Sequence, residues 1–283
     1  MPKLYRRGDE ERLDLQDVRA ITRWMPAMGL LKRYFNYSVE GIEKIPETGP
    51  ALITMNHGPV PVDVPLLGAA IYRSTGRLAR GLTDHAVFKM PVMREMFMAV
   101  GAVDGRHDTA EALLSRGNLV IVMPGGAPEA FKPSSKAYQL YWYRRMGFAR
   151  LAIRAQVPII PAACIGIDDL YTVPLDMFET GRKLFRMRSV PFPLAWGRGP
   201  LPRRVRLTQY VGDPIHSRLP PEAADDDDAV RPFRDRVVEV MESMIADGLR
   251  DRARSGGSSA GESSAGESRP GDGGSGPNGD HDG

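Results

Sequence analysis

Cysteine is almost absent from this chain of 283 residues, in which Cys164 is the only one. A single thiol forms neither an intrachain disulfide nor a cysteine-based metal cluster. Long apolar runs are missing as well, because the longest, at 157–167, is too short to span a bilayer and contains Pro158 and Pro161. No hydrophobic signal region follows the charged first residues. We therefore predict neither a transmembrane helix nor a secretory signal.

Several motifs that would indicate other classes of enzyme are also missing. The sequence has no Gly-rich Lys-Ser/Thr phosphate loop, no dinucleotide-binding fingerprint and no Gly-x-Ser-x-Gly nucleophile elbow. The last absence counts against a serine hydrolase. The histidines are widely spaced, and none has the spacing of a metal ligand. We expect no metal and no bound cofactor.

The end of the chain differs in composition from the rest. Residues 255–283 are mainly Gly, Ser, Pro and acidic residues, which bury too little apolar area to offset their ordering entropy. We predict that this tail is disordered. Without its one Arg and five acidic residues, the body keeps 37 basic and 30 acidic residues, a net charge of +7 instead of +3. Such a body suits an anionic partner (phospholipid head groups, a phosphorylated cofactor or nucleic acid), although +7 is also ordinary for solubility.

Short apolar runs alternate with amphipathic segments along the body. The pattern predicts strands at 51–55, 119–123, 157–167 and 205–211, and helices at 65–72, 135–156 and 231–249. This alternation predicts an α/β fold with a largely parallel central sheet flanked by helices. We expect a single domain at 38–254, preceded by an N-terminal amphipathic helical segment at 1–37.

The N-terminal segment contains a predicted helix at 14–35. Its apolar stripe includes Trp24, and basic residues lie beside the stripe. A basic helix that carries Trp, Phe and Met is able to lie in a membrane interface. The alternative is an ordinary amphipathic helix packed on its own domain. Pro26 is expected to kink or divide it.

His57 is the first candidate catalytic residue. It follows the strand predicted at 51–55 and precedes the conformationally restricted loop 58–61, after which Asp63 falls in the first turn of the next helix. A carboxylate beside a histidine fixes the tautomer and stabilises the imidazolium, so the pair would form a general base for a hydroxyl. The loop must fold back to bring the two together. The alternative is a capping Asp and a loop His that make no contact.

A glycine-rich turn is the second candidate. The strand predicted at 119–123 ends in Pro124-Gly125-Gly126, and Glu129 follows. Two glycines let the backbone approach a ligand and offer N–H groups to an oxyanion. The alternative is a plain turn followed by a solvated glutamate.

Taken together, these motifs resemble the lysophospholipid acyltransferase superfamily, which includes glycerol-phosphate and acylglycerol-phosphate acyltransferases. The resemblance covers roughly 39–215. Its blocks occur in the family's order: Asn56-His57 with Asp63, Gly101 to Arg106, the Pro-Gly-Gly turn with Glu129, Val157-Pro158-Ile159-Ile160-Pro161, and Gly212-Asp213-Pro214-Ile215.

The resemblance implies a role for each site residue. His57 and Asp63 would be the catalytic dyad. Residues near the substrate would be Asn56, Arg106 beside a phosphate, Gly125 and Gly126 at the oxyanion, and Glu129 orienting the acceptor or a loop.

Two departures from the family pattern concern the acceptor. Five residues separate His57 from Asp63 where four are usual, and the third block has Pro-Gly-Gly in place of Pro-Glu-Gly-Thr-Arg. Both changes resemble the diacylglycerol-acyltransferase-like branch, as do 84–89 and 145–149. The missing Arg weakens the case for a phosphate-bearing acceptor, because guanidinium is the natural clamp for phosphate. Arg106 and Lys132 would partly replace it.

By resemblance, the expected function is that of an O-acyltransferase. A fatty acyl group would move from acyl-CoA, or an acyl carrier protein, to a hydroxyl of mono- or diacylglycerol or of a lysophospholipid. The expected location is the cytoplasmic face of the cell membrane, as a peripheral or monotopic protein without a nucleic-acid partner. Two alternatives stay open: a non-catalytic lipid-binding protein on the same fold, and a thioesterase or hydrolase that uses the same dyad on water.

Overall fold

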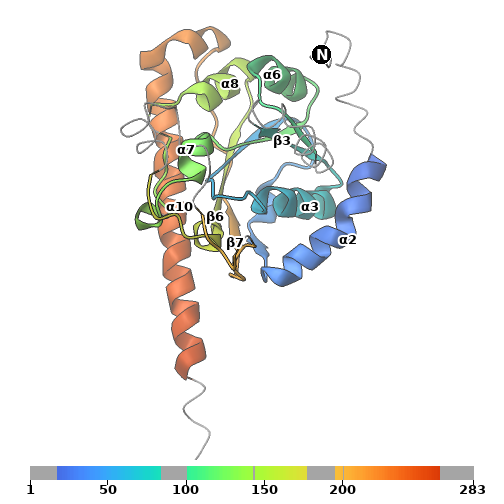
Figure 1. Cartoon of the computed structure of the whole chain (residues 1–283). Helices are drawn as coiled ribbons and strands as arrows, with labels where there is room; N and C mark the ends of the chain where they lie inside the picture. The colour runs from blue at the N-terminus through green and yellow to red at the C-terminus, as the bar shows by residue number, and fades with distance from the viewer. Residues whose placement is uncertain (1–17, 84–100, 143, 177–194, 200, 262–283) are drawn as a thin grey trace, which may run out of the picture. The chain divides into compact units, whose positions relative to one another are not determined.

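One sheet forms the centre of the protein (Figure 1). The computed structural model describes residues 18–83, 101–142, 144–176, 195–199 and 201–261, and within them seven strands pair in the order β1-β7-β6-β2-β5-β3-β4. All these pairs are parallel except β6 with β7. The strands are β1 (Ser38–Glu40), β2 (Ala51–Met55), β3 (Ala79–Thr83), β4 (Ala102–Asp104), β5 (Leu119–Val122), β6 (Ile159–Ile165) and β7 (Thr208–Val211). The predicted α/β fold with a largely parallel sheet is confirmed.

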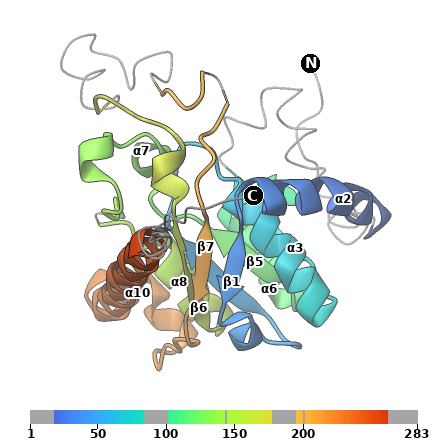
Figure 2. The ribbon, with the colours of Figure 1, turned by 90° about the horizontal axis from the view of Figure 1, so that it is seen from below.

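Helices cover both faces of the sheet. They are α2 (Val18–Tyr34), α3 (Asp63–Thr75), α6 (His107–Ser115), α7 (Gly126–Ala130), α8 (Gly147–Ala155) and α10 (Asp227–Gly261), with short 3-10 turns η1 (Ile42–Lys44), η2 (Ser134–Lys136), η3 (Ile167–Leu170) and η4 (Pro221–Asp225). The β2–α3–β3 crossover runs toward one edge of the sheet, whereas β4–α6–β5 and β5–α8–β6 run toward the other. Because such crossovers are right-handed, α3 lies on the opposite face from α6 and α8. Figure 2 shows α3 and α2 on one side, and α8 and α10 on the other.

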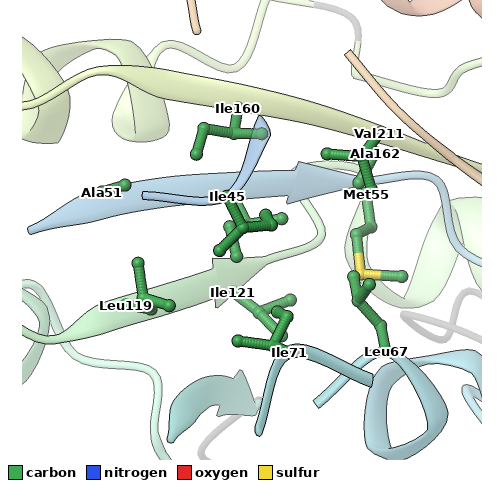
Figure 3. Close-up of a cluster of buried hydrophobic side chains, with 11 residues drawn as sticks. Ile45, Ala51, Met55, Leu67, Ile71, Leu119, Ile121, Ile160, Ala162 and Val211 are labelled. Atoms are coloured by element: carbon green, nitrogen blue, oxygen red, sulfur yellow. The ribbon is translucent and has the colours of Figure 1, made fainter. Parts of the chain in front are cut away.

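The face beneath α3 holds a large apolar cluster (Figure 3). Alternate residues of β2, among them Ile53 and Met55, point toward α3, because successive side chains of a strand face opposite sides. They meet Leu67 and Ile71, which are four residues apart on one side of α3. This packing fixes α3, and therefore its first residue Asp63, against the carboxyl end of β2.

The helix predicted at 135–156 is wrong over its first half. The structure has only the short η2 turn there, and α8 begins at Gly147. The intervening backbone is used elsewhere: the N–H of Tyr138 donates to Asp168 and the N–H of Tyr141 donates to Glu129. A continuous helix would have used both N–H groups internally, so two buried carboxylates keep this segment irregular.

The two ends of the chain differ from expectation in detail. α2 continues through Pro26 as one helix and is not divided. Helix α10 passes the expected boundary at Ser255 and ends at Gly261, since propagation of a formed helix adds a hydrogen bond per residue. Residues 1–17, 262–283 and the 84–89 motif lie outside the described residues. The chain divides into two compact units, Met1–Gly248 and Leu249–Gly283.

None of the helices in the described ranges combines the length and the apolar composition that crossing a membrane requires.

Candidate active site

The predicted site residues gather where three parallel strands end. β2 lies between β5 and β6 and runs parallel to both, so their carboxyl ends meet at one edge of the sheet. His57 follows β2, the Pro124-Gly125 turn follows β5, and Asp168 follows β6. This edge is where α/β sheets bind their ligands.

The His57 ring is held in one tautomer. Its Nδ1 lies 2.7 Å from the carbonyl oxygen of Gly58. Because a carbonyl oxygen only accepts, Nδ1 carries the hydrogen and Nε2 keeps its lone pair. Burial lowers the pKa of His57 to about 4. The charge of Lys132 also lowers this pKa, whereas the hydrogen bond to the Gly58 carbonyl raises it. The imidazole is therefore neutral at pH 7 and has a free basic nitrogen.

Asp63 is buried at the first turn of α3, and neither carboxylate oxygen has a hydrogen-bond partner. Burial raises the pKa of Asp63 to about 7, although the N–H groups of Asp63 and Val64, which are near the carboxylate but outside hydrogen-bond geometry, favour the charged form. Within the described part of the chain, no hydrogen bond or ion pair joins Asp63 to His57, whose Nδ1 meets Gly58 instead. The structure thus brings both residues to one edge of the sheet without the expected direct contact.

Asn56 is not free to meet a substrate, contrary to expectation. The side chain is buried, its Nδ2 donates to the carbonyl oxygen of Cys164 at 3.1 Å, and its Oδ1 accepts from the Cys164 N–H at 2.8 Å. The amide therefore extends the pairing of β2 with β6 by one further step. Asn56 fixes the backbone just before His57.

Glu129 is also fully buried, so of the two expected roles the structure favours orienting a loop. Oε1 accepts the His57 N–H at 2.8 Å and Oε2 accepts the Tyr141 N–H at 3.1 Å. Burial raises the pKa of Glu129 to about 7, opposed by the charge of Lys132 and by these two N–H groups. A Cβ at Gly125 would overlap the carboxylate, so this glycine lets the glutamate fold back over the turn.

The N–H of Gly126 is engaged within the turn, because it donates to the Met123 carbonyl at 3.0 Å. The expectation that it meets an oxyanion does not fit this geometry. Arg145 lies over the same turn: its Nη1 donates to the Pro124 carbonyl at 3.1 Å, and the rest of the exposed guanidinium is available. Arg106, in contrast, is exposed beside α6 and lies 3.6 Å from Asp108.

Lys132 and Asp168 form a buried ion pair that the sequence did not indicate. The Lys132 ammonium lies 2.9 Å from Asp168 Oδ2, and the side chains are only 3% and 5% exposed. Lys132 also donates to the His57 carbonyl at 3.4 Å, and Asp168 accepts the Tyr138 N–H. Burial raises the pKa of Asp168, while the charge of Lys132 opposes the shift. Lys132 is therefore not available to replace the missing phosphate clamp.

Known proteins resemble this chain over the region that carries most of these residues. Residues 36–165 match the family model Acyltransferase. This part of the chain is therefore similar to the acyltransferase family. Among the relatives, a bovine (Bos taurus) protein named "DGAT1/2-independent enzyme synthesizing storage lipids" is 37% identical over 182 residues, covering 64% of this chain and 53% of the relative. An uncharacterized Mycobacterium tuberculosis protein is 32% identical over 225 residues, covering 76% of this chain and 62% of that protein.

A solved structure is also similar. It is the 1-acyl-sn-glycerophosphate (LPA) acyltransferase PlsC of Thermotoga maritima, with a TM-score of 0.49 and 18% identity over 85% of this chain and 88% of that one. The present chain spans about half the length of the bovine relative.

The matched region includes most of the site. It contains His57, Asp63, Glu129 and Lys132, whereas Asp168 lies three residues beyond it. The position of Asp168 could have been predicted from the sequence, because this residue follows a buried strand that ends at the same edge of the sheet as β2. Nothing in the sequence paired it with Lys132, because contact between them depends on the irregular loop before α8.

Replacing Lys132 by methionine is expected to destabilise the protein by about 3–5 kcal/mol, because Asp168 is left buried without its counter-charge. Urea unfolding of the wild type and the variant measures the change. A matched control is Lys44→Met, which breaks an exposed pair with Asp213 at 3.2 Å and should cost ~0–1 kcal/mol. Equal losses in the two variants would contradict a buried pair at Lys132.

Proposed function

We propose that this protein is a glycerolipid O-acyltransferase that uses His57 as its general base. The observation that supports this most directly is the tautomer of His57. With Nδ1–H on the Gly58 carbonyl, Nε2 is a neutral base at the ligand-binding edge of a region similar to the acyltransferase family. The donor is a fatty acyl thioester, acyl-CoA or acyl carrier protein, and the acceptor is a lipid hydroxyl.

The reaction is a direct transfer. Nε2 of His57 takes the proton from the acceptor hydroxyl while its oxygen attacks the thioester carbonyl. The C–S bond breaks, and the departing thiolate takes the proton from the imidazolium. No acyl-enzyme is needed, so the sequence of events uses one histidine as base and then as acid.

Other site residues support His57 in this scheme. Asp63 stabilises the imidazolium, which requires the ring or its loop to turn from the Gly58 carbonyl toward the carboxylate. The N–H of Gly125 is the proposed oxyanion donor, since that of Gly126 is engaged. Asn56 and Glu129 hold the backbone that carries His57.

The acceptor class has two candidates. A neutral acylglycerol agrees with the absent third-block Arg and with the name of the bovine relative, which synthesises storage lipids. A lysophospholipid is the second, because Arg145 places a guanidinium on the Pro124 turn, at the edge of the sheet that carries His57. Binding without catalysis, or hydrolysis of the thioester, would be the outcome if no acceptor were acylated.

Association with the cytoplasmic face of the membrane is part of the proposal, in a peripheral or monotopic manner. Helix α2 exposes Trp24 (42%) and Leu30 (71%) beside the exposed cations Lys32 and Arg33. An exposed aromatic and aliphatic side chain on a basic helix suits an interface between water and lipid.

Transfer of a radiolabelled acyl group from acyl-CoA, and from an acyl carrier protein, tests the function with diacylglycerol, monoacylglycerol and lysophosphatidate as acceptors. His57→Ala is expected to lower the rate at least about 10²-fold, the usual contribution of a general base. His216→Ala, an exposed histidine, should leave it unchanged. Undiminished transfer by His57→Ala would rule out this mechanism, and free fatty acid as the sole product would indicate a hydrolase.

The pH dependence tests Asp63. Below its raised pKa of about 7 this residue is protonated and does not stabilise the imidazolium, so kcat/KM should fall as pH decreases through 7. Asp63→Asn is expected to be slow at every pH and to lack this fall. Glu129 titrates in the same range, so a fall that persists in Asp63→Asn would assign the titration to Glu129 and contradict the role of Asp63.

Arg145→Gln tests the choice of acceptor. If Arg145 binds a phosphate, the KM for lysophosphatidate should rise about tenfold, from the loss of ~1.5 kcal/mol, with the KM for diacylglycerol unchanged. Arg144→Gln removes the same charge from the adjacent exposed position and should change neither. Equal effects of Arg145→Gln on both acceptors would show that Arg145 only shapes the turn.

A further inference from the structure

A pocket of about 320 Å³ lies between α2 and α3, and none of the residues that line it is assigned to catalysis. α3 contributes one face to it: Leu66, Ala69, Ala70 and Arg73 follow the i, i+3, i+4, i+7 spacing of one helix side. The opposite side of α3 packs on the sheet through Leu67 and Ile71. Figure 1 shows α2 beside α3, and Figure 2 shows both on the same side of the sheet.

The lining of the pocket is about half apolar and half polar, and its polar side chains are Lys32, Tyr37, Arg73 and Ser74. The apolar walls include Met28 from α2, Val39 from β1 and Ile42 from η1. The volume depends on the small side chains of Ala69 and Ala70, which leave space that a larger residue would fill. A lining with an apolar part and a polar part suits an amphiphile, with part of an acyl chain against the apolar walls.

Two cations lie at the pocket, one on each helix. Lys32 and Arg73 both line it and are both exposed, and among the described residues neither has an acidic partner. Two uncompensated positive charges beside an apolar space match an amphiphile with an anionic head group.

Tyr37 is a buried residue in the wall of the pocket. Its side chain is 5% exposed, and its hydroxyl is buried without a hydrogen-bond partner. Burial raises the pKa of this hydroxyl, and the charges of Cys164 and Asp63 raise it further, so the hydroxyl lies on the side of Tyr37 toward the sheet and Asp63.

We propose that this pocket binds one phospholipid of an anionic membrane, with its phosphate at Lys32 and Arg73 and the start of an acyl chain between α2 and α3. The membrane is favoured as the source because Trp24, on the same face of α2 as Met28 and Lys32, is exposed at one end of this row. The site rests on the proposed membrane association but not on the transfer reaction. It would hold the protein on the surface where its lipid substrates lie.

Calorimetric titration of the full chain with dihexanoyl phosphatidylglycerol tests the site, and flotation with phosphatidylcholine vesicles, with and without phosphatidylglycerol, tests it on a bilayer. We expect one lipid bound per chain and flotation only with the anionic vesicles. Removing both cations in Lys32→Gln/Arg73→Gln should weaken binding about 25-fold, which is about fivefold for each cation. Arg33→Gln, which removes an equal charge from α2 outside the pocket, should have much less effect.

Ala70→Trp fills the apolar space and leaves both cations in place, so it should abolish binding of the phospholipid while thermal unfolding confirms the fold. The proposal is overturned if Arg33→Gln weakens binding as much as Lys32→Gln, or if Ala70→Trp binds normally. It is also overturned if octanoate, octanoyl-CoA or inorganic phosphate binds as tightly as the phospholipid. His57→Ala should bind the lipid normally, so a failed transfer reaction and a failed lipid site give different results.

Discussion

The buried carboxylate of Glu129 is the constraint on which the site depends. It accepts the backbone N–H of His57 at 2.8 Å and that of Tyr141 at 3.1 Å, and it thereby ties together the ends of β2 and β5 and the loop before α8. Gly125 leaves room for this carboxylate, because a Cβ at that position would overlap it. Without this carboxylate the backbone N–H of His57 would lose its hydrogen bond. The N–H of Tyr141, in the irregular loop before α8, would lose its acceptor as well.

Burial is the main cause of the pKa shifts of the ionisable groups around His57. Three carboxylates (Asp63, Glu129 and Asp168) and one ammonium (Lys132) lie buried near the ends of β2, β5 and β6. Burial raises the pKa of each carboxyl group and lowers that of His57, so Asp63 and Glu129, with pKa values of about 7, titrate above His57, with a pKa of about 4. A neutral imidazole near pH 7 is the consequence. Shifts of this kind, together with a carboxylate that lacks a partner, are typical of a functional site.

Helix α3 connects the proposed catalytic residues to the lipid pocket. Its first residue is Asp63, its inner side packs on the sheet through Leu67 and Ile71, and its outer side faces α2 through Leu66 to Arg73. One rigid element thus positions a carboxylate at its N-terminus and a cation in its last turn. The row from Trp24 to Lys32 on α2 lies on the other side of the proposed lipid pocket. Because Asp63 and Arg73 belong to one helix, the distance between the two proposed sites is fixed.

The sequence by itself determined the fold class, the strands near 51–55 and 119–123, and the position of His57 directly after the first of them, because apolar periodicity and glycine turns are local signals. Only the tertiary structure decided which side chains are free. It engaged Asn56 with Cys164, buried Glu129, paired Lys132 with Asp168, and placed the His57 Nδ1 on Gly58 instead of Asp63. The contacts of Asn56 and Lys132 join residues that are 108 and 36 positions apart in the chain. The contact of His57 depends on the orientation of its ring. A local sequence pattern specifies neither kind of contact.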